Sequence, residues 1–130
     1  MKRRTYLELI AASSLAAIPA LARGEVKPIV LLVDLEVDPA KEQQMLHIFH
    51  TQFAPTAAKQ PGFIDVQMLK LRKALQGPAP AGANYRFTLK MQSEEDRQKW
   101  IATPIHNKLW PTIEATLVSK NYTVLLYDVA

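Results

Sequence analysis

Alternation of apolar and polar residues predicts four β-strands in this chain. The runs that show it are residues 28–37, 63–75, 84–92 and 121–129. In the first run, Asp34 and Glu36 fall between apolar side chains that point to the opposite face. In the third run, Tyr85 shares one face with the apolar residues at every second position after it, while Arg86 lies on the other. This pattern is typical of half-buried strands.

Apolar residues three or four positions apart predict a helix over residues 40–59, after the dipeptide Asp38-Pro39 ends the first strand. The predicted stripe consists of Met45, Leu46, Phe49, Gln52, Phe53, Thr56 and Ala57. His47 lies on the opposite side of this helix. His50 lies at the edge of the stripe, where it can face either a pocket or solvent. Pro55 should kink or shorten the last turns.

A second helix is predicted from residue 94 to about residue 118. Ser93 precedes three acidic residues, and this combination is typical of a helix start because the side chains satisfy free N–H groups and complement the helix dipole. Pro104 cannot donate a backbone hydrogen bond and disfavours helical geometry at Thr103. We therefore expect a break there and a restart before His106.

The predicted order of elements is β-α-β-β-α-β, which is the ferredoxin-like arrangement. We expect an α+β fold in which a four-stranded antiparallel sheet carries both helices on one face. The strands also carry large apolar residues on the face without helices. A second copy packed sheet against sheet is an economical cover, so we expect a homodimer that forms a closed α/β barrel.

Composition narrows the classes of function. The 130 residues are enough for one domain, and 48% apolar with 22% charged residues is ordinary for a globular protein. The chain has no cysteine, which excludes disulfides and cysteine-based metal sites. The formal net charge is +4, of which residues 1–22 contribute +2 through three basic residues and one acidic residue. The rest has no basic run, so we predict no nucleic-acid partner.

Residues 1–22 have the pattern of an export signal. Lys2-Arg3-Arg4 forms a positive start, residues 9–20 are uncharged and rich in alanine, and Ala20-Leu21-Ala22 fits a cleavage site. Arg3-Arg4 resembles a twin-arginine signal, and a general secretory signal is the alternative. The uncharged stretch is short for a membrane span, which needs ~20 apolar residues. We expect a periplasmic or secreted protein without stable membrane insertion after signal removal.

Residues 100–110 are the strongest candidate for a site, because they hold both tryptophans and one of the three histidines. A broken helix with two indoles and an imidazole can form the wall of a small-molecule pocket. The alternative is that Trp100 and Trp110 are core residues and that His106 has a structural role. For a metal, His47 and His50 are three residues apart but lack a third ligand nearby, so we predict no metal site.

Four short motifs resemble the antibiotic biosynthesis monooxygenase family of the dimeric α/β-barrel superfamily. They are Val37–Glu42, Gln60–Phe63, the aromatic third strand leading into Ser93-Glu94-Glu95, and Thr103–His106. The first is similar to the family's V-x-P-G-K-E entry into the first helix, the second to its x-P-G-C/F, and the last to its frequent S-P-H-H. The resemblance covers residues 28–130 and implies a small dimer with a pocket between sheet and helices in each subunit.

This family includes oxygenases that oxidise polyphenols or quinols with O2 and need no metal or flavin. The resemblance implies a cofactor-independent monooxygenase acting on a small aromatic or quinol substrate. Such chemistry needs a base, hydrogen-bond donors and aromatic walls. We expect His106 as the base, because imidazole titrates near neutrality, and Asn107 as a donor. Trp100 and Trp110 would supply walls and an indole N–H. The expected substrate-binding residues are Trp110, His50, Phe49, Phe53, Tyr85 and Arg86.

Two other functions remain open. A non-catalytic small-molecule-binding or stress-response dimer would use the same pocket for an apolar ligand. The family also has a haem-degrading branch, which pairs a tryptophan and a histidine on the second helix with an asparagine on the first strand. Trp100 stands where that branch has its tryptophan, but Trp110 replaces the histidine and the first strand has no asparagine. Motifs for a serine hydrolase, a phosphate loop or a dinucleotide are absent from the sequence.

Overall fold

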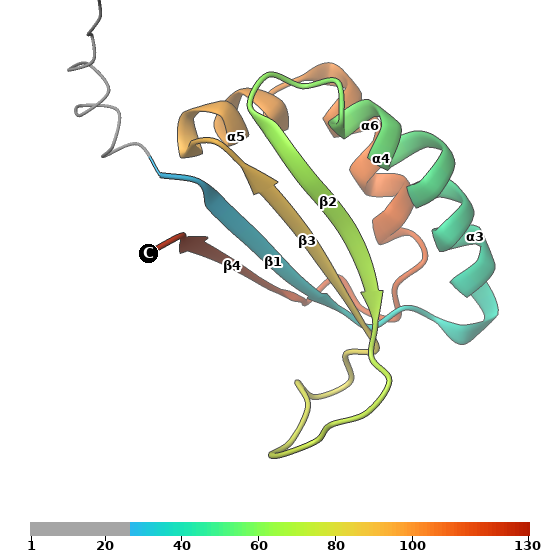
Figure 1. The fold of residues 1–130 in the computed structure, drawn as a ribbon. Helices are drawn as coiled ribbons and strands as arrows, with labels where there is room; N and C mark the ends of the chain where they lie inside the picture. The colour runs from blue at the N-terminus through green and yellow to red at the C-terminus, as the bar shows by residue number, and fades with distance from the viewer. Residues whose placement is uncertain (1–26) are drawn as a thin grey trace, which may run out of the picture.

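The computed structural model describes residues 27–130, so the predicted export signal lies outside the described residues. Figure 1 shows one sheet with the helices on one of its faces. The strands are β1 (Ile29–Leu35), β2 (Phe63–Lys70), β3 (Tyr85–Met91) and β4 (Thr123–Asp128). The helical segments are η3 (Pro39–Lys41), α3 (Glu42–Ile48), η4 (Phe49–Phe53), α4 (Ala54–Ala57), α5 (Glu94–Ile101) and α6 (Pro104–Glu114).

The sheet has the strand order β2-β3-β1-β4, and all neighbouring strands are antiparallel. This confirms the ferredoxin-like α+β fold. Val33 of β1 lies opposite Phe87 of β3 and Val124 of β4, and this register fixes which side chains share a face. β2 ends at Lys70 rather than at residue 75 because β3 begins opposite it, at Tyr85, and the residues that follow have no strand to pair with.

The first helix differs from the prediction in its middle. Between α3 and α4 lies the π-helical segment η4, in which Phe49 and Phe53 are buried. Pro55 follows and has no backbone N–H, so one helical hydrogen bond to the preceding turn is missing. The wider π-helical turn accommodates this missing hydrogen bond. The widening also changes the buried stripe. Contrary to the prediction, Gln52 is exposed and Ile48 is buried. In the wider turn, Phe49 and Phe53 stay on the core side although they are four residues apart, and Gln52 is rotated outward.

The second helix breaks at the predicted place, between α5 and α6. The hydroxyl of Thr103 caps α6 by accepting a hydrogen bond from the backbone N–H of His106 at 3.1 Å. Ser93 caps α5 in the same way, through the backbone N–H of Asp96 at 3.1 Å. α6 ends before the predicted residue 118, because the following chain turns back to pair Leu117 with Val37.

The core lies between the sheet and the helices, where the odd-numbered residues of β1 and β3 are directed. Phe53 is central to it: its ring meets Phe87 and Trp100 edge to face, with centroids 5.5 Å and 5.8 Å apart. On the opposite face of the sheet, Arg86 forms an ion pair with Asp34. β4 forms one edge of the sheet, and all of its residues are exposed.

Candidate functional site

A cavity of about 150 Å³ lies between the sheet and the pair α5 and α6. Its apolar walls come from β1, β3 and β4, together with Phe53 and Ile101. The polar and aromatic residues that line it are Arg97, Trp100, His106, Trp110 and Tyr122. A dry cavity of similar volume, engineered in another protein, takes up benzene. The space is therefore sufficient for one aromatic ring.

His106 is held in the cavity wall by its neighbours in the broken helix. Its ring lies edge to face with Trp100, 5.0 Å between centroids, and 6.2 Å from the ring of Phe53. The Thr103 cap fixes its backbone at the first turn of α6. Among the buried side-chain nitrogen and oxygen atoms of residues 27–130, the Nδ1 of His106 is the one without a hydrogen-bond partner. Because an unpartnered buried nitrogen costs free energy, this position calls for a functional explanation.

The electrostatic environment of His106 favours the neutral imidazole. Burial is the main cause that lowers its pKa below the ordinary value, and the positive charge of Arg97 acts in the same direction, while the Asn107 side chain opposes both. At pH 7 the ring is therefore uncharged and can accept a proton. The structure thus places a neutral base beside an apolar cavity.

Trp110 and Tyr122 close one side of the cavity through a chain of hydrogen bonds. The indole Nε1 of Trp110 donates to the Tyr122 hydroxyl at 2.9 Å, which donates to Glu114 at 2.6 Å. Burial raises the pKa of Tyr122, and Glu114 adds to the effect, so the phenol stays protonated near neutral pH. Trp110 contributes its ring to the wall, with its centroid 5.6 Å from that of Phe53.

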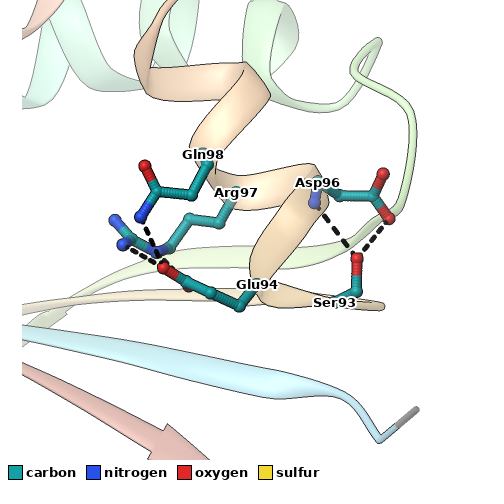
Figure 2. A network of polar contacts seen from close by, with 5 residues as sticks. All are labelled: Ser93, Glu94, Asp96, Arg97 and Gln98. Atoms are coloured by element: carbon teal, nitrogen blue, oxygen red, sulfur yellow. Dashed lines mark hydrogen bonds and ion pairs between the residues drawn. The ribbon is translucent and has the colours of Figure 1, made fainter.

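Arg97 is a cavity residue that the sequence reasoning did not identify. Its Nε and Nη2 each donate to the Glu94 carboxylate at 2.7 Å, and Gln98 donates to the same carboxylate at 2.7 Å (Figure 2). The Arg97 side chain is only 14% exposed, and the pair with Glu94 raises the pKa of its guanidinium. The available signal was spacing, because Arg97 precedes Trp100 by three residues and therefore shares its face of α5.

The predicted site residues divide into two groups. Trp100, His106, Trp110 and Phe53 line the cavity together. Phe49 is buried behind it, with its ring 6.3 Å from that of Phe53, and His50 is exposed at the edge of Phe49. Asn107 is also exposed and does not line the cavity, although its side chain acts on the neighbouring His106.

The two predicted residues of β3 lie outside this cavity. The Tyr85 hydroxyl donates to Glu42 at 2.5 Å, and Lys70 forms an ion pair with the same carboxylate at 2.7 Å. Burial, with a contribution from Glu42, raises the pKa of Tyr85 to about 12. Arg86 lies on the opposite face of the sheet, where its Nε is 2.8 Å from Asp34. The structure therefore places the odd-numbered face of β3 towards the helices, and Phe87 and Leu89 of this face line the cavity.

Residues 27–130 contain no group of three or more histidine or carboxylate side chains placed to hold a metal ion. None of the helices in this range has the length and apolar character needed to cross a membrane.

Comparisons with known proteins identify the fold. No family model matches the sequence, and no curated protein sequence matches it. Among solved structures, a protein from Caulobacter crescentus CB15, provisionally named an antibiotic biosynthesis monooxygenase, is 16% identical with a TM-score of 0.64, over 85% of this chain and 98% of that one. A dimeric ferredoxin-like protein of unknown function from Jannaschia sp. CCS1 is 16% identical with a TM-score of 0.62, over 79% and 98%.

A haem-degrading protein from Mycobacterium tuberculosis is also similar, with 19% identity and a TM-score of 0.56 over 81% of this chain and 93% of that one. At such low identity these likenesses establish a shared fold. The chain has the fold found in proteins named antibiotic biosynthesis monooxygenases, and other proteins with that fold carry different functional names.

Proposed function

We propose that this protein is a cofactor-independent monooxygenase that oxidises a small aromatic or quinol substrate with O2. The observation that carries the proposal is His106, a neutral imidazole in the wall of an apolar cavity that has room for one ring. Trp100 and Trp110 add aromatic walls to the same cavity. The shared fold with proteins named antibiotic biosynthesis monooxygenases supports the same reaction class.

The reaction needs no external reductant. His106 accepts the proton of a phenolic hydroxyl, and the electron-rich phenolate transfers one electron to O2. The phenoxyl radical and superoxide combine at the ring, and the resulting peroxide takes the proton back from His106. The hydroperoxide so formed loses water to give a quinone. One oxygen atom of O2 ends in the quinone and the other in water, and all four electrons come from the substrate. The apolar walls keep bulk water away from the radical pair.

The test is O2 uptake by the purified protein with a panel of quinols and single-ring phenols, with metals chelated. We expect uptake that falls about 10²-fold or more in His106→Ala, since a general base contributes that much. His47→Ala is the matched control, because His47 is exposed on α3 and does not line the cavity. Uptake that is equal in the wild type and His106→Ala would contradict the assignment of the base.

A non-catalytic binding protein is the second candidate, and the cavity itself favours it, since its walls are largely apolar and it has the volume of one ring. Such a protein would bind single-ring ligands with no O2 uptake. Haem is the weaker candidate, because a four-pyrrole macrocycle exceeds a cavity of about 150 Å³. A Soret shift on titration with haemin would show that the cavity expands to bind it.

We also propose that the protein is a homodimer joined through the open face of the sheet. That face carries Leu69, Leu125 and Tyr127, which are 44%, 41% and 50% exposed. A dimeric relative with the same fold supports this arrangement. Light scattering after gel filtration should give twice the chain mass. Leu125→Lys should shift the protein to monomer by placing a charge among these apolar side chains.

Export to the periplasm or medium through residues 1–22 is a further part of the proposal. Fractionation of cells that express the full chain should place the mature protein outside the cytoplasm. Replacing Arg3 and Arg4 by lysine distinguishes the two routes: a twin-arginine signal would fail, whereas a general secretory signal would still work. Retention of the wild-type chain in the cytoplasm would contradict export.

A further inference from the structure

We propose that the cavity selects aromatic rings that carry a carboxylate, and that Arg97 is the specificity-determining residue that binds this carboxylate. The proposal names a substrate class for the proposed monooxygenase and rests on that function. Its first observation is the charge of the lining. Arg97 is the one charged residue among those that line the cavity within the described part of the chain. An apolar enclosure with a single cation in its wall matches a ligand with an apolar ring and one negative end.

The geometry of Arg97 leaves donors for a second anion. The pair with Glu94 uses Nε and Nη2, so the Nη1 nitrogen takes no part in it. A guanidinium has five N–H donors in a planar fork and commonly binds more than one carboxylate. Because Arg97 is largely buried and already held by Glu94, a ligand finds the guanidinium pre-positioned and pays little side-chain entropy to bind it.

Glu94 does not cancel the charge of Arg97 completely. Its carboxylate also accepts a hydrogen bond from Gln98 at 2.7 Å and lies in the first turn of α5, where the helix dipole stabilises a negative charge. Part of the negative charge of Glu94 is thus compensated by groups other than Arg97. The positive charge of Arg97 still acts towards the cavity, since it adds to burial in lowering the pKa of His106.

The position of His106 agrees with a ligand held at its charged end. Arg97 and His106 both line the cavity, and Arg97 is close enough to act electrostatically on the imidazole. A phenolic acid whose carboxylate binds Arg97 would keep its ring between Trp100 and Trp110. Its hydroxyl would then be the group that gives its proton to neutral His106. Phenolic acids with one ring are therefore the expected substrates.

The experiment measures binding separately from turnover. Trp100 and Trp110 are the two tryptophans of the chain and both line the cavity, so quenching of their fluorescence reports occupancy. Benzoate and its neutral isostere benzamide are titrated at pH 7. We expect benzoate to bind the wild type about tenfold or more tightly, because hydrogen bonds to a charged group are the strong ones. Equal affinity for the two ligands would overturn the proposal.

Variants separate a specific role of Arg97 from a structural one. Arg97→Gln should abolish the preference for benzoate and leave the affinity for benzamide within about twofold. Lys99→Gln is the matched control, since Lys99 is exposed on the same helix and should leave both affinities unchanged. Weaker binding of both ligands in Arg97→Gln by the same factor would show a structural role and overturn the proposal.

The outcomes distinguish this inference from the proposed function. A preference for benzoate that depends on Arg97, without O2 uptake on any phenol, supports the specificity and contradicts the monooxygenase. O2 uptake that depends on His106, without a preference for benzoate over benzamide, supports the monooxygenase and contradicts the specificity. If Arg97→Gln does not fold, as judged by circular dichroism, Arg97→Lys keeps the charge and should retain a reduced preference for benzoate. Equal affinity for benzoate and benzamide in a folded Arg97→Lys with intact benzamide binding would overturn the proposal.

Discussion

The indole N–H of Trp110 is bound to the Tyr122 hydroxyl at 2.9 Å, and the two rings meet edge to face with centroids 6.2 Å apart. This contact joins α6 to the segment that leads into β4 and closes one side of the cavity. The hydrogen bond to Tyr122 also uses the indole N–H of Trp110, which the sequence predicts as a donor to the substrate. Trp110 therefore contributes an aromatic surface to the site, and hydrogen-bond donation to a ligand falls to other groups.

Tyr122→Phe should lower the free energy of unfolding by about 1 kcal/mol, because Trp110 and Glu114 each lose a partner in a half-buried place. Urea denaturation followed by circular dichroism measures the change. A midpoint for Tyr122→Phe equal to that of the wild type would show that the chain of hydrogen bonds adds no stability.

Thr103→Ala should destabilise the protein by about 1 kcal/mol, because the backbone N–H of His106 loses its capping acceptor at the start of α6. The same hydroxyl donates to the carbonyl of Trp100 at 2.8 Å, so it fixes the angle between α5 and α6. Thr103→Ser keeps the hydroxyl and should retain most of the stability. If serine and alanine variants unfold at the same urea concentration, the cap is not the source of the effect.

The fold was predictable because its signals are local. The alternation in β1 and β3, the Ser93 cap and the break at Pro104 each follow from a few neighbouring residues. The burial of Ile48 in place of Gln52 was not predictable, because it depends on a π-helical turn in η4. Such a turn is a response to Pro55 and to packing, and periodicity at 3.6 residues per turn does not contain it.

The site was predictable where its residues are neighbours in sequence. Trp100, His106 and Trp110 meet because one broken helix carries them. Arg97 was missed because a charged residue in a charged helical turn is usually solvated, and only packing against the sheet shows that it is enclosed. Arg86 was grouped with the pocket because strand alternation alone does not say which face carries the helices, and the structure places it with Asp34 on the other face.

Gly62 in the turn before β2 should tolerate a side chain poorly. Its φ is +82°, and an added Cβ would overlap the Asp96 side chain, which takes part in the Ser93 cap. Gly62→Ala should cost about 2–3 kcal/mol, from backbone strain together with displacement of Asp96. Gly77→Ala is the matched control, since its φ is +72° with no atom near the added Cβ, and should cost about 1 kcal/mol. Equal losses of stability would show that Asp96 moves aside freely.

Protonation of His106 should make the protein less stable in mild acid. In the unfolded chain the histidine titrates near pH 6.5, and burial lowers its pKa in the folded state. Below pH 6.5 the unfolded chain therefore holds a proton that the folded protein does not, and stability falls with falling pH towards the lowered pKa. Urea midpoints between pH 7.5 and 5 should decline more steeply for the wild type than for His106→Asn. His47→Asn, on the exposed side of α3, should follow the wild type. If His106→Asn has the wild-type slope, burial does not perturb this imidazole, and its assignment as a neutral base in the cavity loses its physical basis.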